Sequence, residues 1–216
     1  MTRTTILFLH SAGPQSATEG SGPLLARLRA ELPDVPISAP ALPTPDDPDP
    51  EAWEEAVRAE IAGQEGPVVV GHSLGGSVAL RVLASGGPAW PEAVRGVVTI
   101  AAPCWDEHDP DWPVAGFGLP PDVVDAPASD DVLLLHGTAD ELVPPDHADR
   151  LRSRLPSAQV RRIEGMDHAA AAHADRIAEV LRPLLGASDE AFPPDADATG
   201  PGRSGWTRSG STSPRR

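Results

Sequence analysis

The sequence contains no lysine and no tyrosine, and it has a single cysteine, Cys104. One cysteine cannot form a disulfide within the chain, so we expect a free thiol in a reducing, cytoplasmic environment. The 17 basic side chains, all arginines, are outnumbered by 32 acidic ones, which gives a formal net charge of −15. This balance argues against nucleic acid or an anionic membrane as a partner, because either would need a basic face.

Long apolar runs are also missing. The first apolar stretch, residues 6–9, leaves no room for a signal segment before it, and no later run reaches membrane-spanning length. With 216 residues and 40% hydrophobic composition, the chain can bury one sizeable core, so we expect a single domain over residues 1–186. From Ala187 onward the composition shifts to Gly, Pro, Ser, Thr and Asp, which predicts a disordered tail over residues 187–216.

The most informative stretch is Val68-Val69-Val70-Gly71-His72-Ser73-Leu74-Gly75-Gly76-Ser77. An apolar β-branched run enters a G-x-S-x-G motif and continues into a helical pattern, which is the strand-turn-helix context that a nucleophile elbow requires. Glycines at positions 71 and 75 allow Ser73 to occupy a strained turn with its hydroxyl projecting. The backbone N–H of Leu74, at the start of the helix, would then face a developing oxyanion. His72 is expected to pack and form hydrogen bonds rather than to react.

Strand and helix patterns alternate along the whole chain, which favours an α/β fold with a mostly parallel sheet and helices on both faces. The predicted strands cover residues 4–10, 35–39, 68–70, 94–102, 132–136 and 158–163. Predicted helices begin at Ser21 as an N-cap with Pro23 in the first turn, at residue 51, after Ser73, near Pro144 and near Ala170. Residues 103–131 are too irregular for a long helix and predict a small cap-like insertion that carries Trp105, Trp112 and Phe117.

Residues just beyond the carboxyl ends of parallel strands converge on one crevice, so the partners of Ser73 should lie there. Asp140 and His168 both follow predicted strands, and the chain order Ser73, Asp140, His168 fits a catalytic triad. Four neighbours compete for these roles, namely Glu141, Asp167, His147 and His173. Cys104 with His108 has no further ligand at suitable spacing, so no metal site is predicted.

Together these motifs resemble the α/β-hydrolases, and among them the small serine hydrolases named after a retinoblastoma-binding protein and their bacterial relatives. The likeness covers roughly residues 4–185. It rests on His10-Ser11, on Pro40-Ala41-Leu42-Pro43 leading to Pro50 and Trp53, on the elbow, on His136-Gly137-Thr138-Ala139-Asp140 running on to Val143-Pro144, and on His168.

The resemblance implies Ser73 as nucleophile, His168 as base and Asp140 as orienting acid, with no cofactor. Ser11 stands where many α/β-hydrolases carry glycine, so we place the second oxyanion donor at the backbone N–H of Ala12, to within one residue.

The expected activity is hydrolysis of a small carboxylic ester or thioester through an acyl-enzyme. Two alternatives are cofactor-free perhydrolase or haloperoxidase-like chemistry at the same triad, and a non-catalytic binding protein on the same fold. Trp105, Trp112 and Phe117 either wall a small substrate pocket or cover the edge of the sheet. The sequence decides neither the natural substrate nor the oligomeric state.

Overall fold

The computed structural model describes residues 4–85, 94–106, 116–121, 123 and 132–186. Its strands are β1 (Ile6–Leu9), β2 (Ile37–Ser38), β3 (Val68–His72), β4 (Gly96–Ile100), β5 (Val132–Gly137) and β6 (Gln159–Ile163). Its helices are α1 (Gly22–Glu31), α2 (Pro50–Ala62), α3 (Leu74–Ser85), α5 (His147–Arg154) and α6 (Ala174–Gly186), with a 3₁₀ turn η3 (Ala171–His173) before α6. The predicted tail and most of the predicted cap lie outside the described residues.

The six strands form one sheet in the order β2-β1-β3-β4-β5-β6, and every neighbouring pair is parallel. The chain runs from β1 outward to the edge strand β2, returns to β3 beside β1, and then proceeds to the other edge at β6. The strand order therefore reverses between β1 and β3, and the loops after these two strands face each other there. In open α/β sheets this switch point is where ligands bind.

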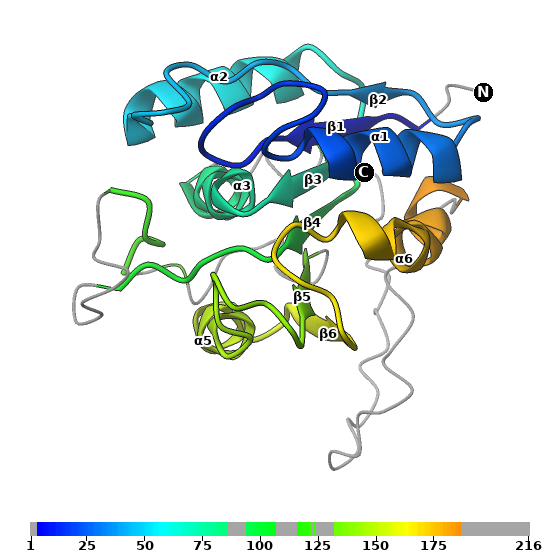
Figure 1. The fold of residues 1–216 in the computed structure, drawn as a ribbon. Coiled ribbons are helices and arrows are strands. Elements are labelled where there is room, and N and C mark those ends of the chain that lie inside the picture. Colours follow the sequence, from blue (N-terminus) through cyan, green and yellow to red (C-terminus); the bar gives the residue numbers. More distant parts are fainter. Residues whose placement is uncertain (1–3, 86–93, 107–115, 122, 124–131, 187–216) are drawn as a thin grey trace, which may run out of the picture.

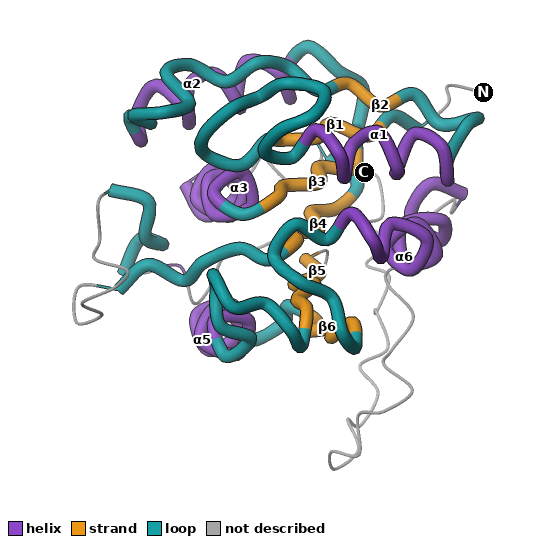
Figure 2. The backbone as a smooth tube through the Cα atoms, viewed as in Figure 1, coloured by secondary structure: helices purple, strands orange, loops and turns teal. Residues whose placement is uncertain are grey.

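Helices cover both faces of the sheet, as the alternation of elements predicts (Figures 1 and 2). Leu7 and Leu9 of β1 pack with α2, α3 and α5 on one face, whereas Ile6 and Phe8 pack with α1 and α6 on the other. This division follows from the two-residue repeat of a strand, which sends alternate side chains to opposite faces. The buried strands are accordingly apolar on both faces.

Local signals explain where several elements begin and end. The carboxylate of Asp49 accepts a hydrogen bond from the N–H of Ala52 over 2.8 Å and caps α2, whose first residue is Pro50. The predicted helix near residue 170 starts later, because Ala170 has a left-handed backbone with a φ of 58° and α6 begins only at Ala174. The helix expected near Pro144 likewise begins at His147.

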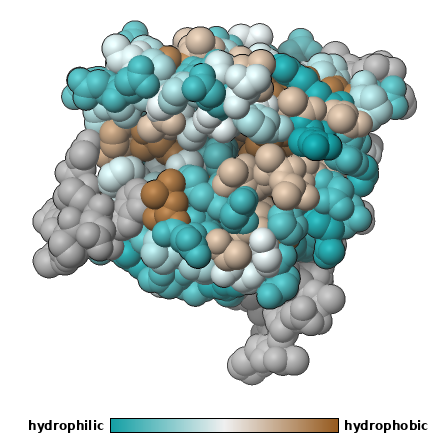
Figure 3. All heavy atoms as spheres, viewed as in Figure 1, coloured by the Kyte–Doolittle hydropathy of each residue, from teal (hydrophilic) through white to brown (hydrophobic). Residues whose placement is uncertain are grey.

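One face of the molecule is mostly polar. Figure 3 shows a face dominated by hydrophilic and neutral residues with small hydrophobic spots. Among the residues that the structure describes, Leu142 is the one large hydrophobic side chain that is exposed, at 62%. Within the same residues, no helix has both the length and the apolar composition needed to cross a membrane.

Candidate active site

Ser73 lies in the turn between β3 and α3 with a left-handed backbone and a φ of 52°. Its N–H donates to the carbonyl of Ile100 over 2.8 Å, which ties this turn to β4. A Cβ atom on Gly71 would lie 2.5 Å from the carbonyl oxygen of Gly75, and one on Gly75 would lie 2.5 Å from that of His10. Because carbon atoms cannot approach backbone so closely, the elbow requires glycine at both positions.

Three side chains from three strand ends form one hydrogen-bonded chain. The Nε2 atom of His168 lies 3.1 Å from the Oγ atom of Ser73, and its Nδ1 atom lies 2.9 Å from Oδ2 of Asp140. Ser73 follows β3, Asp140 follows β5 and His168 follows β6, so the parallel strands deliver all three to one edge of the sheet. The structure therefore brings together the three residues that the sequence selects.

The carboxylate of Asp140 is fully buried, and both of its oxygen atoms have hydrogen-bond partners. Its Oδ1 atom accepts hydrogen bonds from the N–H groups of Leu142 and Val143 over 3.0 and 2.8 Å, and Oδ2 lies 3.4 Å from Nε2 of His136. Burial opposes ionisation, but the hydrogen bonds from His136, His168 and Val143 outweigh it and hold the pKa of Asp140 well below its usual range. An ionised Asp140 accepts a hydrogen bond from the Nδ1–H group of His168. In this tautomer, Nε2 of His168 has no proton and can accept a hydrogen bond from the hydroxyl of Ser73.

The competing acidic residues lie elsewhere. Glu141 and Asp167 are both exposed, and the carboxylate of Asp167 accepts a hydrogen bond from the N–H of Ala170 over 2.9 Å. Asp140 is therefore the carboxylate that contacts the imidazole of His168.

The competing histidines are also accounted for. Nδ1 of His147 accepts a hydrogen bond from the N–H of Cys104 over 2.9 Å, and His173 lies in η3. Within the described residues, no group of three or more His, Cys, Asp and Glu side chains could hold a metal ion. His108 lies outside these residues.

The two backbone N–H groups predicted to bind an oxyanion, those of Leu74 and Ala12, belong to different elements. Leu74 is the first residue of α3, so its N–H has no acceptor inside the helix. In the loop after β1, the N–H of Ser11 donates to Oγ of Ser21 over 2.8 Å and that of Gly13 donates to the carbonyl of Pro45 over 2.7 Å. Among the described residues, the N–H of Ala12, which lies between these two, has no hydrogen-bond acceptor.

Ser21 does not act as the N-cap that the sequence predicts. It occupies the residue before α1, but its hydroxyl makes no capping bond. Instead, its Oγ atom lies 2.8 Å from Nδ1 of His72 and 3.0 Å from Oγ of Ser11. The prediction that this side chain caps α1 was wrong, because its hydroxyl contacts Ser11 of the same loop and His72 at the end of β3. A link between Ser21 and the elbow was not visible in the local sequence.

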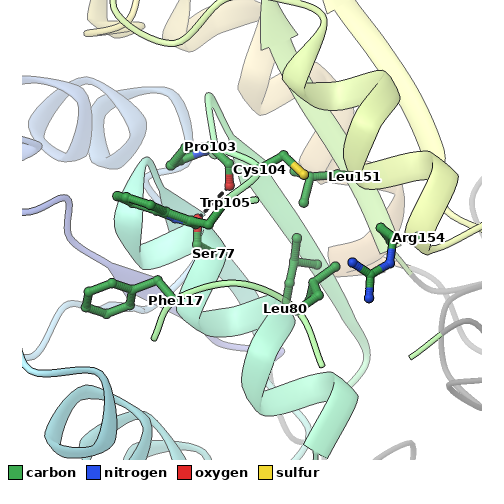
Figure 4. A pocket seen from close by; sticks show the side chains of 9 residues that line it. Ser77, Leu80, Pro103, Cys104, Trp105, Phe117, Leu151 and Arg154 are labelled. Carbon is green, nitrogen blue, oxygen red and sulfur yellow. Dashed lines mark hydrogen bonds between the residues drawn. The ribbon is translucent and has the colours of Figure 1, made fainter. Parts of the chain in front are cut away.

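Trp105 and Phe117 pack against each other, with ring centroids 5.7 Å apart, and line a narrow pocket (Figure 4). The indole N–H of Trp105 donates to Oγ of Ser77 over 3.1 Å, and this hydroxyl donates to the carbonyl of Pro103 over 2.9 Å. The remaining lining residues are Leu80, Cys104, Leu119, Leu151 and Arg154. None of Ser73, Asp140 and His168 lines this pocket, and Trp112 lies outside the described residues.

The fold and the arrangement of these loops define a class, the α/β-hydrolases. A sequence model described as "Alpha/beta hydrolase family" matches residues 6–129. The chain belongs to the alpha/beta hydrolase family.

Several solved structures are similar to the chain in fold. The ydeN gene product of B. subtilis is 18% identical over 85% of this chain and 100% of its own, with a TM-score of 0.65. The meta-cleavage product hydrolase CumD of Pseudomonas fluorescens IP01 is 14% identical over 84% and 90% of the two chains, with a TM-score of 0.63. XC6422 of Xanthomonas campestris, described as an a/b serine hydrolase without lid, is 18% identical over 86% and 84%, with a TM-score of 0.56. No curated protein sequence matches the chain.

Proposed function

We propose that this protein is a cofactor-independent serine hydrolase that cleaves a small carboxylic ester or thioester. The observation that carries the proposal is the continuous hydrogen-bonded chain from Ser73 through His168 to Asp140, with separations of 3.1 and 2.9 Å. A hydroxyl in hydrogen-bond reach of an imidazole that a buried carboxylate orients is the geometry of an activated serine nucleophile. The description of XC6422 as a serine hydrolase agrees with this assignment.

The proposed reaction begins when Nε2 of His168 takes the proton of Ser73 as Oγ attacks the carbonyl carbon of the substrate. The negative charge that develops on the carbonyl oxygen is stabilised by the N–H groups of Leu74 and Ala12. Collapse of this intermediate breaks the bond to the alcohol or thiol, which leaves with the proton held by His168. A water molecule, deprotonated by His168, then attacks the acyl group on Ser73, and the acid is released as His168 gives this proton to the Oγ atom of Ser73.

Within the family, we place the chain with the small serine hydrolases named after a retinoblastoma-binding protein. Their Pro and Trp signature has a physical counterpart here, since the indole N–H of Trp53 donates to the carbonyl of Pro43 over 2.6 Å. This bond fastens the proline-rich loop to α2, and Trp53 is itself fully buried. With a net charge of −15, we propose a small-molecule partner and neither nucleic acid nor an anionic membrane.

The test is labelling with a fluorophosphonate probe together with turnover of p-nitrophenyl acetate. Wild-type protein should be labelled, whereas Ser73→Ala should not be, and its turnover should fall by about 10³-fold or more. Ser153→Ala is the matched control, because Ser153 is exposed on α5 and its hydroxyl donates to the carbonyl of Asp149 in the same helix over 2.9 Å.

Two other outcomes would revise the proposal. Wild-type protein that takes up no probe and turns over no ester would favour the non-catalytic binding protein. Products of peroxide attack formed in preference to hydrolysis would favour perhydrolase chemistry at the same serine.

A further inference from the structure

A buried row of polar groups runs from the loop after β1 to the loop that carries His168. The N–H of Ser11 donates to Oγ of Ser21 over 2.8 Å, and this Oγ atom lies 2.8 Å from Nδ1 of His72. On its other side, Nε2 of His72 lies 2.8 Å from the carbonyl oxygen of His168. His72 and Ser21 are 2% and 0% exposed. Nothing in the proposed reaction uses these two side chains.

The hydrogen-bond partners fix where the protons lie. A carbonyl oxygen can only accept, so Nε2 of His72 carries the proton that it donates to His168. Nδ1 is then the acceptor in a neutral imidazole, and the hydroxyl of Ser21 donates to it. The two lone pairs of the Ser21 Oγ atom then accept from the N–H of Ser11 and from the hydroxyl of Ser11, whose Oγ atom lies 3.0 Å away. One consistent arrangement thus connects Ser11, Ser21, His72 and His168.

We propose that His72 and Ser21 are positioning residues that hold the His168 backbone and the Ser11–Ala12 loop in register with Ser73. The proposal rests on the proposed function, because only an activated Ser73 gives this alignment a catalytic consequence. His72 directly precedes Ser73, so its ring is anchored to the elbow itself. Its Nε2 atom then connects the elbow to His168, and its Nδ1 atom connects the elbow through Ser21 to the loop that carries Ser11 and Ala12.

The position of His168 is sensitive to this link. Its ring contacts that of His72 at a centroid distance of 5.3 Å, and its Nε2 atom must stay within reach of Ser73. The imidazole of His168 is attached to a backbone segment that His72 contacts through one hydrogen bond, to the carbonyl of His168. Misplacing a catalytic group by about 1 Å can slow a reaction about 10²-fold.

The electrostatic environment keeps His72 in the neutral form that the link requires. The pKa of His72 is lowered to about 4, chiefly by burial, and His168 and His10 also lower it while Asp140 raises it. The hydrogen bond to the His168 carbonyl also raises it. The ring of His72 is therefore neutral near pH 7.

The test compares His72→Leu, which removes the donor, with His72→Gln, whose amide can still donate to the carbonyl of His168. The readouts are the rate of fluorophosphonate labelling, kcat and KM, measured on proteins whose melting temperatures show them folded. We expect His72→Leu to lower the labelling rate and kcat by about 10- to 100-fold with little change in KM. His72→Gln should restore most of both.

A second variant keeps the test decisive if His72→Leu fails to fold. Ser21→Ala removes the acceptor of the Ser11 N–H and the donor to His72, and it should slow labelling by about 10-fold. Ser153→Ala should label at the wild-type rate. In the double variant His72→Leu/Ser21→Ala, the loss should be smaller than the product of the single losses, because both act through one chain of bonds.

The outcomes separate this inference from the proposed function. If wild-type protein is not labelled at Ser73, the proposed function fails and the positioning roles fail with it. If wild-type protein is labelled, but His72→Leu and Ser21→Ala both label at the wild-type rate, the serine hydrolase stands and the positioning roles are wrong. Equal slowing in His72→Leu and His72→Gln would also overturn the role assigned to the Nε2 donor.

Discussion

The Nδ1 atom of His168 donates a hydrogen bond to Oδ2 of Asp140 over 2.9 Å, although the two residues stand 28 positions apart and follow different strands. Two backbone N–H groups of the same loop, those of Leu142 and Val143, donate to the carboxylate of Asp140 and fix its orientation. The imidazole is thus oriented by a group that cannot rotate away.

This contact predicts a large difference between two neighbouring substitutions. Asp140→Asn should lower kcat for p-nitrophenyl esters by about 10²-fold or more, because the amide would favour the wrong tautomer of His168. The exposed Glu141 has no contact with His168, so Glu141→Gln should leave kcat nearly unchanged. A greater loss in the glutamate variant would show that the wrong acid has been assigned.

The buried His72 makes stability depend on pH. Its pKa is about 4 in the folded protein and 6.5 ordinarily, so the unfolded state binds the proton more readily. The contribution of His72 to the free energy of unfolding should therefore be fully present above pH 6.5 and fall as the pH drops towards 4. At pH 5 this group should lower the free energy of unfolding by about 2 kcal/mol.

Urea denaturation at pH 7 and pH 5 measures the effect. The drop should be smaller in His72→Gln, which has no titrating group at this site. The same drop in both proteins would place the titration elsewhere, for example at His10, whose pKa burial also lowers.

The elbow glycines differ sharply from a glycine at a helix end. In Gly75→Ala the new Cβ atom would meet the backbone oxygens of His10 and Leu9 at 2.5 and 2.6 Å, so we expect a loss of about 1–3 kcal/mol or more in the free energy of unfolding. In Gly63→Ala the nearest atoms lie 3.6 Å away and the φ of −81° suits alanine. Thermal unfolding should show little change in this control.

The pocket beside Trp105 and Phe117 predicts a preference for short acyl chains. The pocket is too narrow to bury a long acyl chain, so each methylene beyond it would stay in water and gain nothing of the ~0.8 kcal/mol available on burial. Values of kcat/KM for p-nitrophenyl esters should peak between acetyl and butyryl and then decline. A steady rise through decanoyl would refute a small pocket.

Phe117→Ala tests whether this pocket takes the acyl group. Removal of the ring should enlarge the pocket and move the optimum to longer chains. An unchanged profile with a lower melting temperature would mean that Trp105 and Phe117 only cover the sheet, since Ser73 does not line their pocket.

The elbow and the order of elements could be predicted from the sequence, and so could the convergence of Ser73, Asp140 and His168. Their constraints are local or follow from the topology. Gly71 and Gly75 are required by the turn that they flank, and parallel strands bring Asp140 and His168 to the same edge as Ser73. The expectation that His72 forms hydrogen bonds is confirmed by its contacts with Ser21 and His168. The parallel sheet with helices on both faces is confirmed as well.

The role of Ser21 could not be predicted, because a serine before Pro23 has the same local sequence whether its hydroxyl caps α1 or points inward. Its partner His72 is 51 residues away. The late start of α6 depends similarly on the left-handed backbone of Ala170, and alanine gives no warning of this conformation. Both features are decided by tertiary contacts that no periodicity encodes.

The edge position of β6 has a consequence for how the protein would lose activity. Among the described strands, β6 pairs with β5 alone, and the turn that follows it carries His168. A subglobal opening that detaches β6 would withdraw the base from Ser73 while the centre of the sheet stayed folded. Inactivation by denaturant should therefore precede the change in fluorescence of the fully buried Trp53, and the amides of β6 should exchange with deuterium sooner than those of β3.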